Sequence, residues 1–263
     1  MSRINPIAQG TQVLGTLVLG FLLLPVLAVI PASINESSFI KIPPEHYSTR
    51  WYYALLTDGG WIASIVASFE IAVLATLLSV VLGTLAALGL ERVGPRWRSI
   101  LTGLLLAPLI VPVIMTSIAL YYAMRRLGLQ GTVPALALGH TLLCLPFVVL
   151  NVGVSLNRLD PSLPRAAAGL GASPLHIFRT VTLPAITPGL AAGAAFAFIT
   201  SFDEVVISIF LAGVETKTLP VKLWEQIRVE FTPVAAAGSA VILVTTVLMF
   251  LLVQLARGRG KGP

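Results

Sequence analysis

The chain has 263 residues, of which 56% are hydrophobic and only 11% are charged, and its mean hydropathy is +0.93. Soluble domains carry about 25% charged residues, so the composition excludes a soluble protein and predicts an all-α protein that crosses a membrane several times. The net charge of +6 is spread over short loops and a basic C-terminal tail, a pattern that does not indicate nucleic-acid binding.

Six apolar segments are long enough to cross the ~30 Å hydrocarbon core of a membrane. In chain order they cover about residues 11–31, 61–89, 99–124, 132–156, 185–211 and 235–256. Pro108 and Pro112 lie inside the third segment, where they either line a path at a kink or form a bend that the membrane tolerates. We therefore expect a single transmembrane domain over residues 1–263.

Six spans place both termini on one side of the membrane, and that side carries more basic residues. It holds Arg3, Arg92, Arg96, Arg98, Arg158, Arg165, Arg179, Arg257, Arg259 and Lys261. The opposite side holds Lys41, Arg50, Arg125, Arg126, Lys217, Lys222 and Arg228. Since basic loops stay in the cytoplasm, the sequence predicts cytoplasmic termini.

The longest polar interruption on the cytoplasmic side is the segment 157–184, between the fourth and fifth spans. Ala166–Ala168 favours a helix, and Gly171 allows the chain to bend after it. Ser173 then caps a second helix, whose first residue is a proline, and Pro184 ends that helix. Such a helix–bend–helix is shaped to dock into a cleft of another protein.

The residue pattern of this segment resembles the EAA loop of ABC importer permeases, which forms the coupling helix on the ATPase subunit. The residues that carry the resemblance are Ala166, Ala167, Gly171, Phe178, Leu183 and Pro184. The resemblance implies that this segment, with Arg165 and Ser173, is the ATPase-coupling loop. The family usually has glutamate where this chain has Arg165, so the likeness implies the shape of the loop but no salt bridge at its first position.

Other stretches resemble the second permease subunit of spermidine/putrescine-type ABC importers, namely Ser48–Tyr52, Pro108–Pro112 and Ser201–Ser208. The resemblance implies a type I importer fold in a bacterial inner membrane. It also implies a distinct second permease subunit, two ATPase subunits and a periplasmic substrate-binding protein as partners. ATP and magnesium would bind the ATPase, since this chain lacks a GxxxxGK[ST] phosphate loop and is expected to hold no cofactor or metal.

Three acidic residues lie within the expected spans: Glu70 in the second, and Asp203 and Glu204 in the fifth. A helical rise of ~1.5 Å per residue places Glu70 and Asp203 at about the same depth, near the midplane. On a continuous helix Asp203 and Glu204 would point about 100° apart, so only one would face a given cavity. The acids either are protonated and join helices, or face a path on which a cation passes.

These patterns predict the permease subunit of an importer for a small cationic solute, above all a polyamine such as spermidine or putrescine. The nearest alternative is a permease for another amine-bearing solute, such as an aminophosphonate or an opine. A self-sufficient secondary transporter would need no docking loop. A membrane enzyme is a further alternative, but there is no catalytic motif, and His46, His140 and His176 lack metal-ligand spacing.

Overall fold

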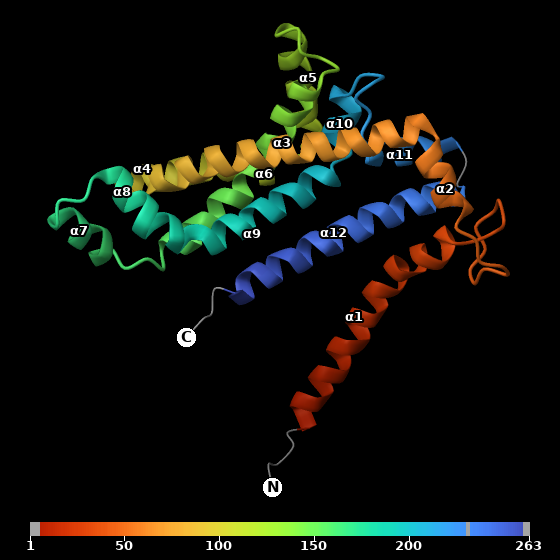
Figure 1. Cartoon of the computed structure of the whole chain (residues 1–263), viewed down its shortest axis with the longest axis horizontal. Coiled ribbons are helices and arrows are strands. Elements are labelled where there is room, and N and C mark those ends of the chain that lie inside the picture. Colours follow the sequence, from red (N-terminus) through yellow and green to blue (C-terminus); the bar gives the residue numbers. More distant parts are fainter. Residues whose placement is uncertain (1–5, 230–231, 260–263) are drawn as a thin grey trace. The chain divides into compact units, whose positions relative to one another are not determined.

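A computed structural model describes residues 6–229 and 232–259, and helices make up most of this part of the chain. Within these ranges an isolated antiparallel bridge between Asn35 and Tyr47 is the only extended pairing. The elements in chain order are α1 (Pro6–Ser33), α2 (Arg50–Thr57), α3 (Gly59–Leu90), α4 (Pro95–Leu106), η1 (Ala107–Leu109), α5 (Val113–Arg126), α6 (Val133–Leu156), α7 (Ser162–Gly169), α8 (Pro174–Ile177), η2 (Phe178–Thr182), α9 (Leu183–Phe202), α10 (Val206–Leu211), α11 (Leu219–Val229) and α12 (Pro233–Arg259) (Figure 1).

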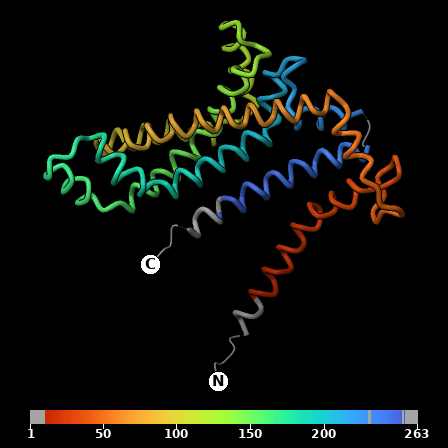
Figure 2. The backbone as a smooth tube through the Cα atoms, viewed as in Figure 1, coloured from red at the N-terminus to blue at the C-terminus, as the bar shows by residue number. Residues whose placement is uncertain are grey.

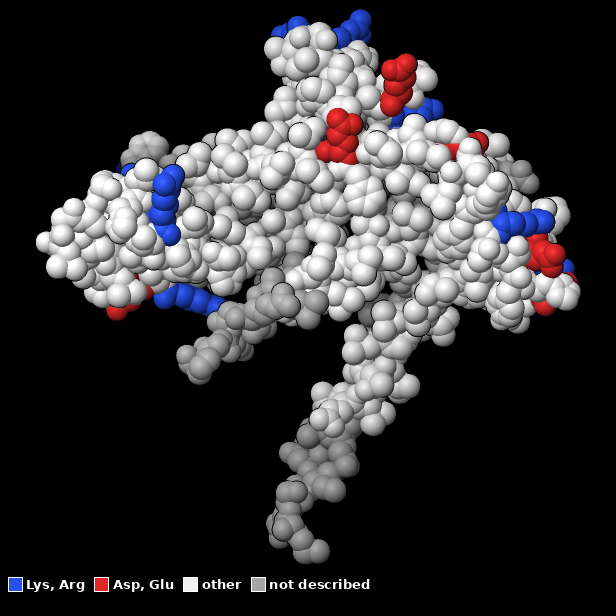
Figure 3. Space-filling model, in the orientation of Figure 1, with Lys and Arg blue, Asp and Glu red and all other residues white. Residues whose placement is uncertain are grey.

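Five helical segments are long and apolar enough to cross a membrane. They are Thr11–Ser33, Gly59–Leu90, Val133–Leu156, Pro174–Phe202 and Pro233–Leu252, and a bent helix pair could supply a sixth crossing. The face shown in Figure 3 carries few charged side chains, and most of its surface is uncharged. The prediction of an all-α membrane protein is therefore confirmed.

The expected third span, 99–124, is not one straight helix. Pro95–Leu109 and Val113–Arg126 meet at an angle of 94°. The bend lies between Leu109 and Val113, where Pro112 has an extended ψ of 123° just before α5 and disfavours a helical conformation for the residue before it, whereas Pro108 lies within η1. A bend was part of both roles considered for Pro108 and Pro112, so which role they have stays a prediction.

The expected fifth span, 185–211, is also interrupted. Helix α9 ends at Phe202 and α10 begins at Val206, so Asp203, Glu204 and Val205 form a break between two helices. No proline or glycine marks this break in the sequence. It is built by side-chain hydrogen bonds, which are described with the site below.

The expected single domain consists of two compact units, and their boundaries fall inside α3, α11 and α12. The first unit comprises Met1–Ile62 and Leu223–Leu243. In it the Trp51 indole N–H donates to the Asn35 carbonyl oxygen at 2.6 Å, and the Tyr52 hydroxyl lies 2.7 Å from Ser33 Oγ. The aromatic residues of α2 therefore fasten α2 to the segment that follows α1.

The second unit comprises Ala63–Lys222 and Val244–Pro263, and its centre is the pair α6 and α9. These helices run side by side (Figure 2). Glycine allows the close approach: a Cβ at Gly193 would lie 2.9 Å from the Val148 Cα, and one at Gly189 would overlap the Asn151 carbonyl. Between membrane helices such contacts of small residues supply the attraction that the hydrophobic effect supplies in water.

Candidate functional site

The bend of the 157–184 loop has the geometry that its sequence predicts. Gly171 has a φ of +84°, its N–H donates to the Ala168 carbonyl oxygen, and the Ala172 N–H donates to the Ala167 carbonyl oxygen. This pair of bonds is a Schellman motif, which closes the C-terminus of α7 and favours glycine at the residue with positive φ. A Cβ on Gly171 would meet no atom within 4 Å, so backbone conformation alone selects the glycine.

The start of the second loop helix is also confirmed. The Ser173 hydroxyl accepts a hydrogen bond from the His176 backbone N–H at 3.3 Å, and Pro174 occupies the first turn of α8. Upstream, the Asp160 carboxylate accepts from the Ser162 N–H at 2.8 Å. This hydrogen bond, together with the nearby Arg165 guanidinium, holds the pKa of Asp160 below its ordinary value.

The expected end of the second loop helix at Pro184 is wrong. The helical path continues from α8 through η2 into α9, and Pro184 lies in the first turn of α9. Proline lacks the N–H that an α-helix needs and collides with the carbonyl one turn before it. The π-helical turn η2 adjusts that turn, with the Leu183 N–H donating to the Phe178 carbonyl oxygen.

The predicted coupling residues divide into an exposed group and a group that packs on the chain itself. Arg165, Ala166 and Gly171 are exposed. Phe178 is half-buried, and Leu183 is packed against the core cluster that contains Val148 and Ile186. The first group is available to a partner, while the second holds the loop to the α6–α9 pair.

The loop also presents leucines that the sequence reasoning did not select. Leu163, Leu170 and Leu175 are exposed, and Leu170, next to the bend, is 89% exposed. The sequence of this loop, which also contains alanine, isoleucine, phenylalanine and valine, does not show which of its apolar residues are exposed, but apolar residues that are exposed together can mark a contact surface. These leucines and Arg165 form what we call the loop face.

The three predicted acids have different environments. Glu70 and Asp203 are exposed, whereas Glu204 is half-buried. The Glu204 carboxylate accepts from the backbone N–H groups of Val206 at 3.1 Å, Ile207 at 2.7 Å and Ser208 at 3.3 Å. The Glu204 side chain thus caps the N-terminus of α10, whose N-cap position is Val205. The expectation of one continuous helix through Asp203 and Glu204 is wrong, since the helix is broken there. That only one of the two acids faces a given cavity stays a prediction.

Aromatic contacts place Glu70 and Asp203 at the same level of the second unit. The Phe69 ring lies 4.8 Å from the Phe202 ring and 6.1 Å from the Phe198 ring, and the Phe198 and Phe202 rings stack at 5.6 Å. Glu70 follows Phe69 and Asp203 follows Phe202, so each acid is next to a ring of this aromatic cluster. The sequence-based expectation of matching depth agrees with these contacts.

The break is further held by His140, which the sequence analysis did not select as a site residue. The buried His140 ring on α6 lies within hydrogen-bond distance of Ser201 and Ser208, on either side of the break. Because polar pairs across membrane helices leave no strong sequence pattern, only the structure connects these three residues.

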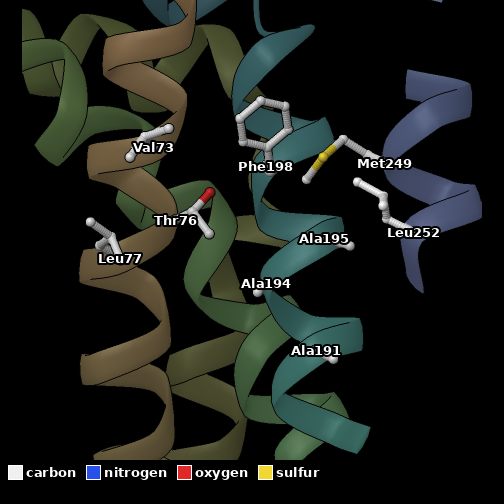
Figure 4. A pocket seen from close by; sticks show the side chains of 9 residues that line it. All are labelled: Val73, Thr76, Leu77, Ala191, Ala194, Ala195, Phe198, Met249 and Leu252. Atoms are coloured by element: carbon white, nitrogen blue, oxygen red, sulfur yellow. The ribbon is translucent and has the colours of Figure 1, made fainter. Parts of the chain in front are cut away.

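Figure 4 shows a crevice of the second unit between α3, α9 and α12, with a volume of about 260 Å³. Its lining is almost entirely apolar: Val73, Thr76, Leu77, Ala191, Ala194, Ala195, Phe198, Met249 and Leu252. None of the three acids belongs to this lining, so the crevice suits alkyl groups and not a charged group. Over the ranges 6–229 and 232–259, no cluster of three or more His, Cys, Asp or Glu could hold a metal ion.

The amino-acid sequence has relatives among transport proteins. A family model described as "Binding-protein-dependent transport system inner membrane component" matches residues 79–261. The spermidine/putrescine transport system permease protein PotC of Escherichia coli (strain K12) is 32% identical over 248 residues, which are 94% of each chain. The molybdenum transport system permease protein ModB of Mycobacterium bovis is 32% identical over 247 residues, 87% of this chain and 93% of that protein.

Solved structures share the fold. A chain of a bacterial ABC transporter involved in the import of the acidic polysaccharide alginate matches with a TM-score of 0.73 at 17% identity, over 97% of this chain and 99% of that one. A chain of the MetNI methionine ABC transporter matches with a TM-score of 0.59 at 21% identity, over 79% of this chain and 95% of that one. At these identities the likeness concerns the fold alone.

Proposed function

Because the chain belongs to the family of binding-protein-dependent transport system inner membrane components, we propose that it carries a polyamine such as spermidine or putrescine across the inner membrane. It is a multi-pass permease subunit with the ABC importer permease fold. Dependence on a binding protein removes the self-sufficient secondary transporter as an alternative. The observation that carries the proposed substrate is the likeness to polyamine permeases over 94% of the chain.

Sequence identity alone does not determine the substrate, because the molybdenum permease is also 32% identical to this chain, as PotC is. The chemistry of the break favours a cation. Asp203 is exposed at the C-terminal end of α9, where the helix dipole adds partial negative charge. Broken membrane helices use such ends to hold cations.

The aromatic cluster adds a second feature that suits a polyamine. An ammonium group is attracted to the face of an aromatic ring, and the methylene segments of a polyamine pack on apolar surface. Phe69 is 39% exposed and adjoins Glu70, so one short stretch of α3 offers both a ring and a carboxylate. Glu70 and Asp203 are therefore the proposed substrate-path acids, and Glu204 contributes by capping α10.

The loop face is the proposed contact with the ATPase. In this arrangement two ATPase subunits bind ATP and magnesium, and this chain binds no cofactor. A distinct second permease subunit completes the path, and a periplasmic binding protein delivers the substrate. The exposed leucines around Gly171 support the contact, because they would leave water on docking.

The excess of basic residues on the side of the termini supports a cytoplasmic loop face. A single cysteine at Ser173, in a Cys144→Ala background, tests this orientation with a membrane-impermeant thiol reagent. We expect labelling only in inverted vesicles. Labelling from outside intact cells would reverse the orientation and remove the ATPase contact.

Uptake of labelled spermidine and putrescine into vesicles that contain the complete importer tests the substrate. We expect Asp203→Asn and Glu70→Gln to reduce uptake about tenfold or more, since each removes a charge while keeping shape. Glu215→Gln, at an exposed acid outside the break, is the matched control. If both amide variants take up polyamine at the rate of the parent, the acids do not support a polyamine substrate, and only the family likeness does.

A further inference from the structure

A single buried histidine bridges the two helices that flank the break. His140 Nδ1 on α6 lies 2.8 Å from Ser201 Oγ in the last turn of α9. His140 Nε2 lies 3.0 Å from Ser208 Oγ in the first turn of α10. All three side chains are buried, so the imidazole joins α9 and α10 at a place where the backbone helix is discontinuous.

The chemistry of this bridge requires a group with two opposed hydrogen-bonding atoms. A neutral imidazole has one N–H donor and one acceptor nitrogen, and each serine hydroxyl can donate or accept. One serine therefore donates to the ring while the other accepts from it. An apolar ring at position 140 would leave two buried hydroxyls without these bonds.

The neighbouring glycine brings α10 within reach of the histidine. A Cβ at Gly139 would lie 3.0 Å from side-chain atoms of both Ile207 and Leu211, tighter than ordinary van der Waals contact. Leu136, on the same helix, belongs to one core cluster with Ile207 and Leu211. Helix α10 is thus held to α6 by packing as well as by the histidine.

Helices α6 and α9 flank the coupling loop. Helix α6 ends at Leu156, where the loop starts, and α9 begins at Leu183, where it finishes. Helices α6 and α9 pack closely through Gly189 and Gly193, so the pair forms a tight hairpin. The loop lies at one end of this hairpin, and the break with Asp203 lies at the other.

We propose that His140 is a positioning residue for transport, a latch that ties α10 to the α6–α9 hairpin so that a displacement of the coupling loop reaches the break. This inference rests on the proposed function, in which an ATPase moves the loop. Without the latch, α10 would keep only its packing on α6 and its short link to α9, so it would follow the hairpin less closely, and the geometry around Asp203 would depend less on ATP hydrolysis.

Three variants separate a latch from a residue that only stabilises the core. His140→Phe removes both bonds. The triple variant His140→Phe/Ser201→Ala/Ser208→Ala also removes the two hydroxyls, so these three positions are all apolar and none holds an unpaired polar group. Its free energy of unfolding should therefore return toward that of the parent. His140→Gln keeps one donor and one acceptor. Ser79→Ala is the control, since Ser79 is a buried serine that donates to the Thr141 carbonyl oxygen of α6 and not to the His140 ring.

The measurement is the number of polyamine molecules transported per ATP hydrolysed, in proteoliposomes with the complete importer and its binding protein. For the triple variant we expect normal assembly and basal ATPase activity, with at least a tenfold loss of transport per ATP. His140→Gln should retain part of the coupling, and Ser79→Ala all of it. Parent-level coupling in the triple variant would overturn the latch and leave His140 a core residue.

A distance measurement keeps this test independent of the substrate. Spin labels at Phe196 on α9 and Ile209 on α10, both exposed, in a Cys144→Ala background, report the geometry of the break. The parent complex should give a narrow distance distribution that ATP binding does not change, because the latch holds α10 to the α6–α9 hairpin, and the triple variant should give a broad one. If the parent transports no polyamine, the proposed substrate fails, while a distribution in the triple variant as narrow as the parent's contradicts the latch.

Discussion

The coupling loop and the break between α9 and α10 are both interruptions of helix in one stretch of chain, yet they are built in opposite ways. The loop bend is exposed and is closed by residues within six positions of one another, from Ala167 to Ser173. The break is partly exposed, and it is held by the buried His140, which is 61 positions from Ser201 and 68 from Ser208. A bend in water needs only local rules, whereas a break inside a membrane must find partners for its polar groups from another helix.

This contrast predicts that docking of the loop depends on the backbone conformation of a single residue, Gly171. Gly171→Val should abolish uptake almost completely, because a β-branched residue is rarely found at positive φ. Gly171→Asn should be much milder, since asparagine tolerates that region. Uptake and copurification of the ATPase are the measurements. Equal uptake by the two variants would show that the positive φ of Gly171 does not matter for docking.

The break should instead depend on side-chain acceptors. Glu204→Ala removes all three bonds to the N-terminus of α10, and loss of an N-terminal cap costs about 0.5–2 kcal/mol. Thermal unfolding of the purified chain in detergent should show this loss of stability. Glu204→Gln keeps one acceptor oxygen, so its melting temperature should lie between those of the parent and Glu204→Ala. Glu215→Ala, at an exposed acid, should leave the melting temperature unchanged. A melting temperature of Glu204→Ala equal to the parent's would contradict the capping role.

The smallest effect is expected at Arg165. The side chain is exposed, so replacing it should leave the loop conformation intact, and Arg165→Glu should change uptake less than about twofold, within the range of exposed charge changes. It should also raise the pKa of Asp160, since one of the influences that lower that pKa is removed. A titration of the loop by NMR would measure that shift. A large loss of uptake would instead place Arg165 opposite an acid of the ATPase.

Predictions from the sequence were accurate where neighbouring residues determine the backbone conformation. Gly171 and Ser173 specify their own conformations, and Pro112 marks the bend of the third crossing. The predictions were less accurate where partners come from distant residues. Nothing around Asp203 breaks a helix by propensity, so the fifth span was expected to be continuous, and Glu204 was grouped with Asp203 although it caps α10.

Pro184 shows how a correct local rule can give a wrong boundary. Proline inside a helix usually kinks or ends it, but here the preceding turn widens and the helix continues. The exposed leucines of the loop were missed for a different reason, since the composition of a loop does not show which of its apolar residues face water. Leu170 could be recognised only once the bend placed it at the exposed end of the loop.

The π-helical turn η2 has a consequence for the direction of the loop face. A π turn holds one residue more than an α turn, so the faces of α8 and α9 are offset by one residue, which corresponds to about 100° around the helix axis. If the residues Phe178–Thr182 formed an ordinary α-helical turn, the loop face would be rotated by about that angle relative to α9. The direction in which the chain presents Leu170 is therefore set by the width of this one turn.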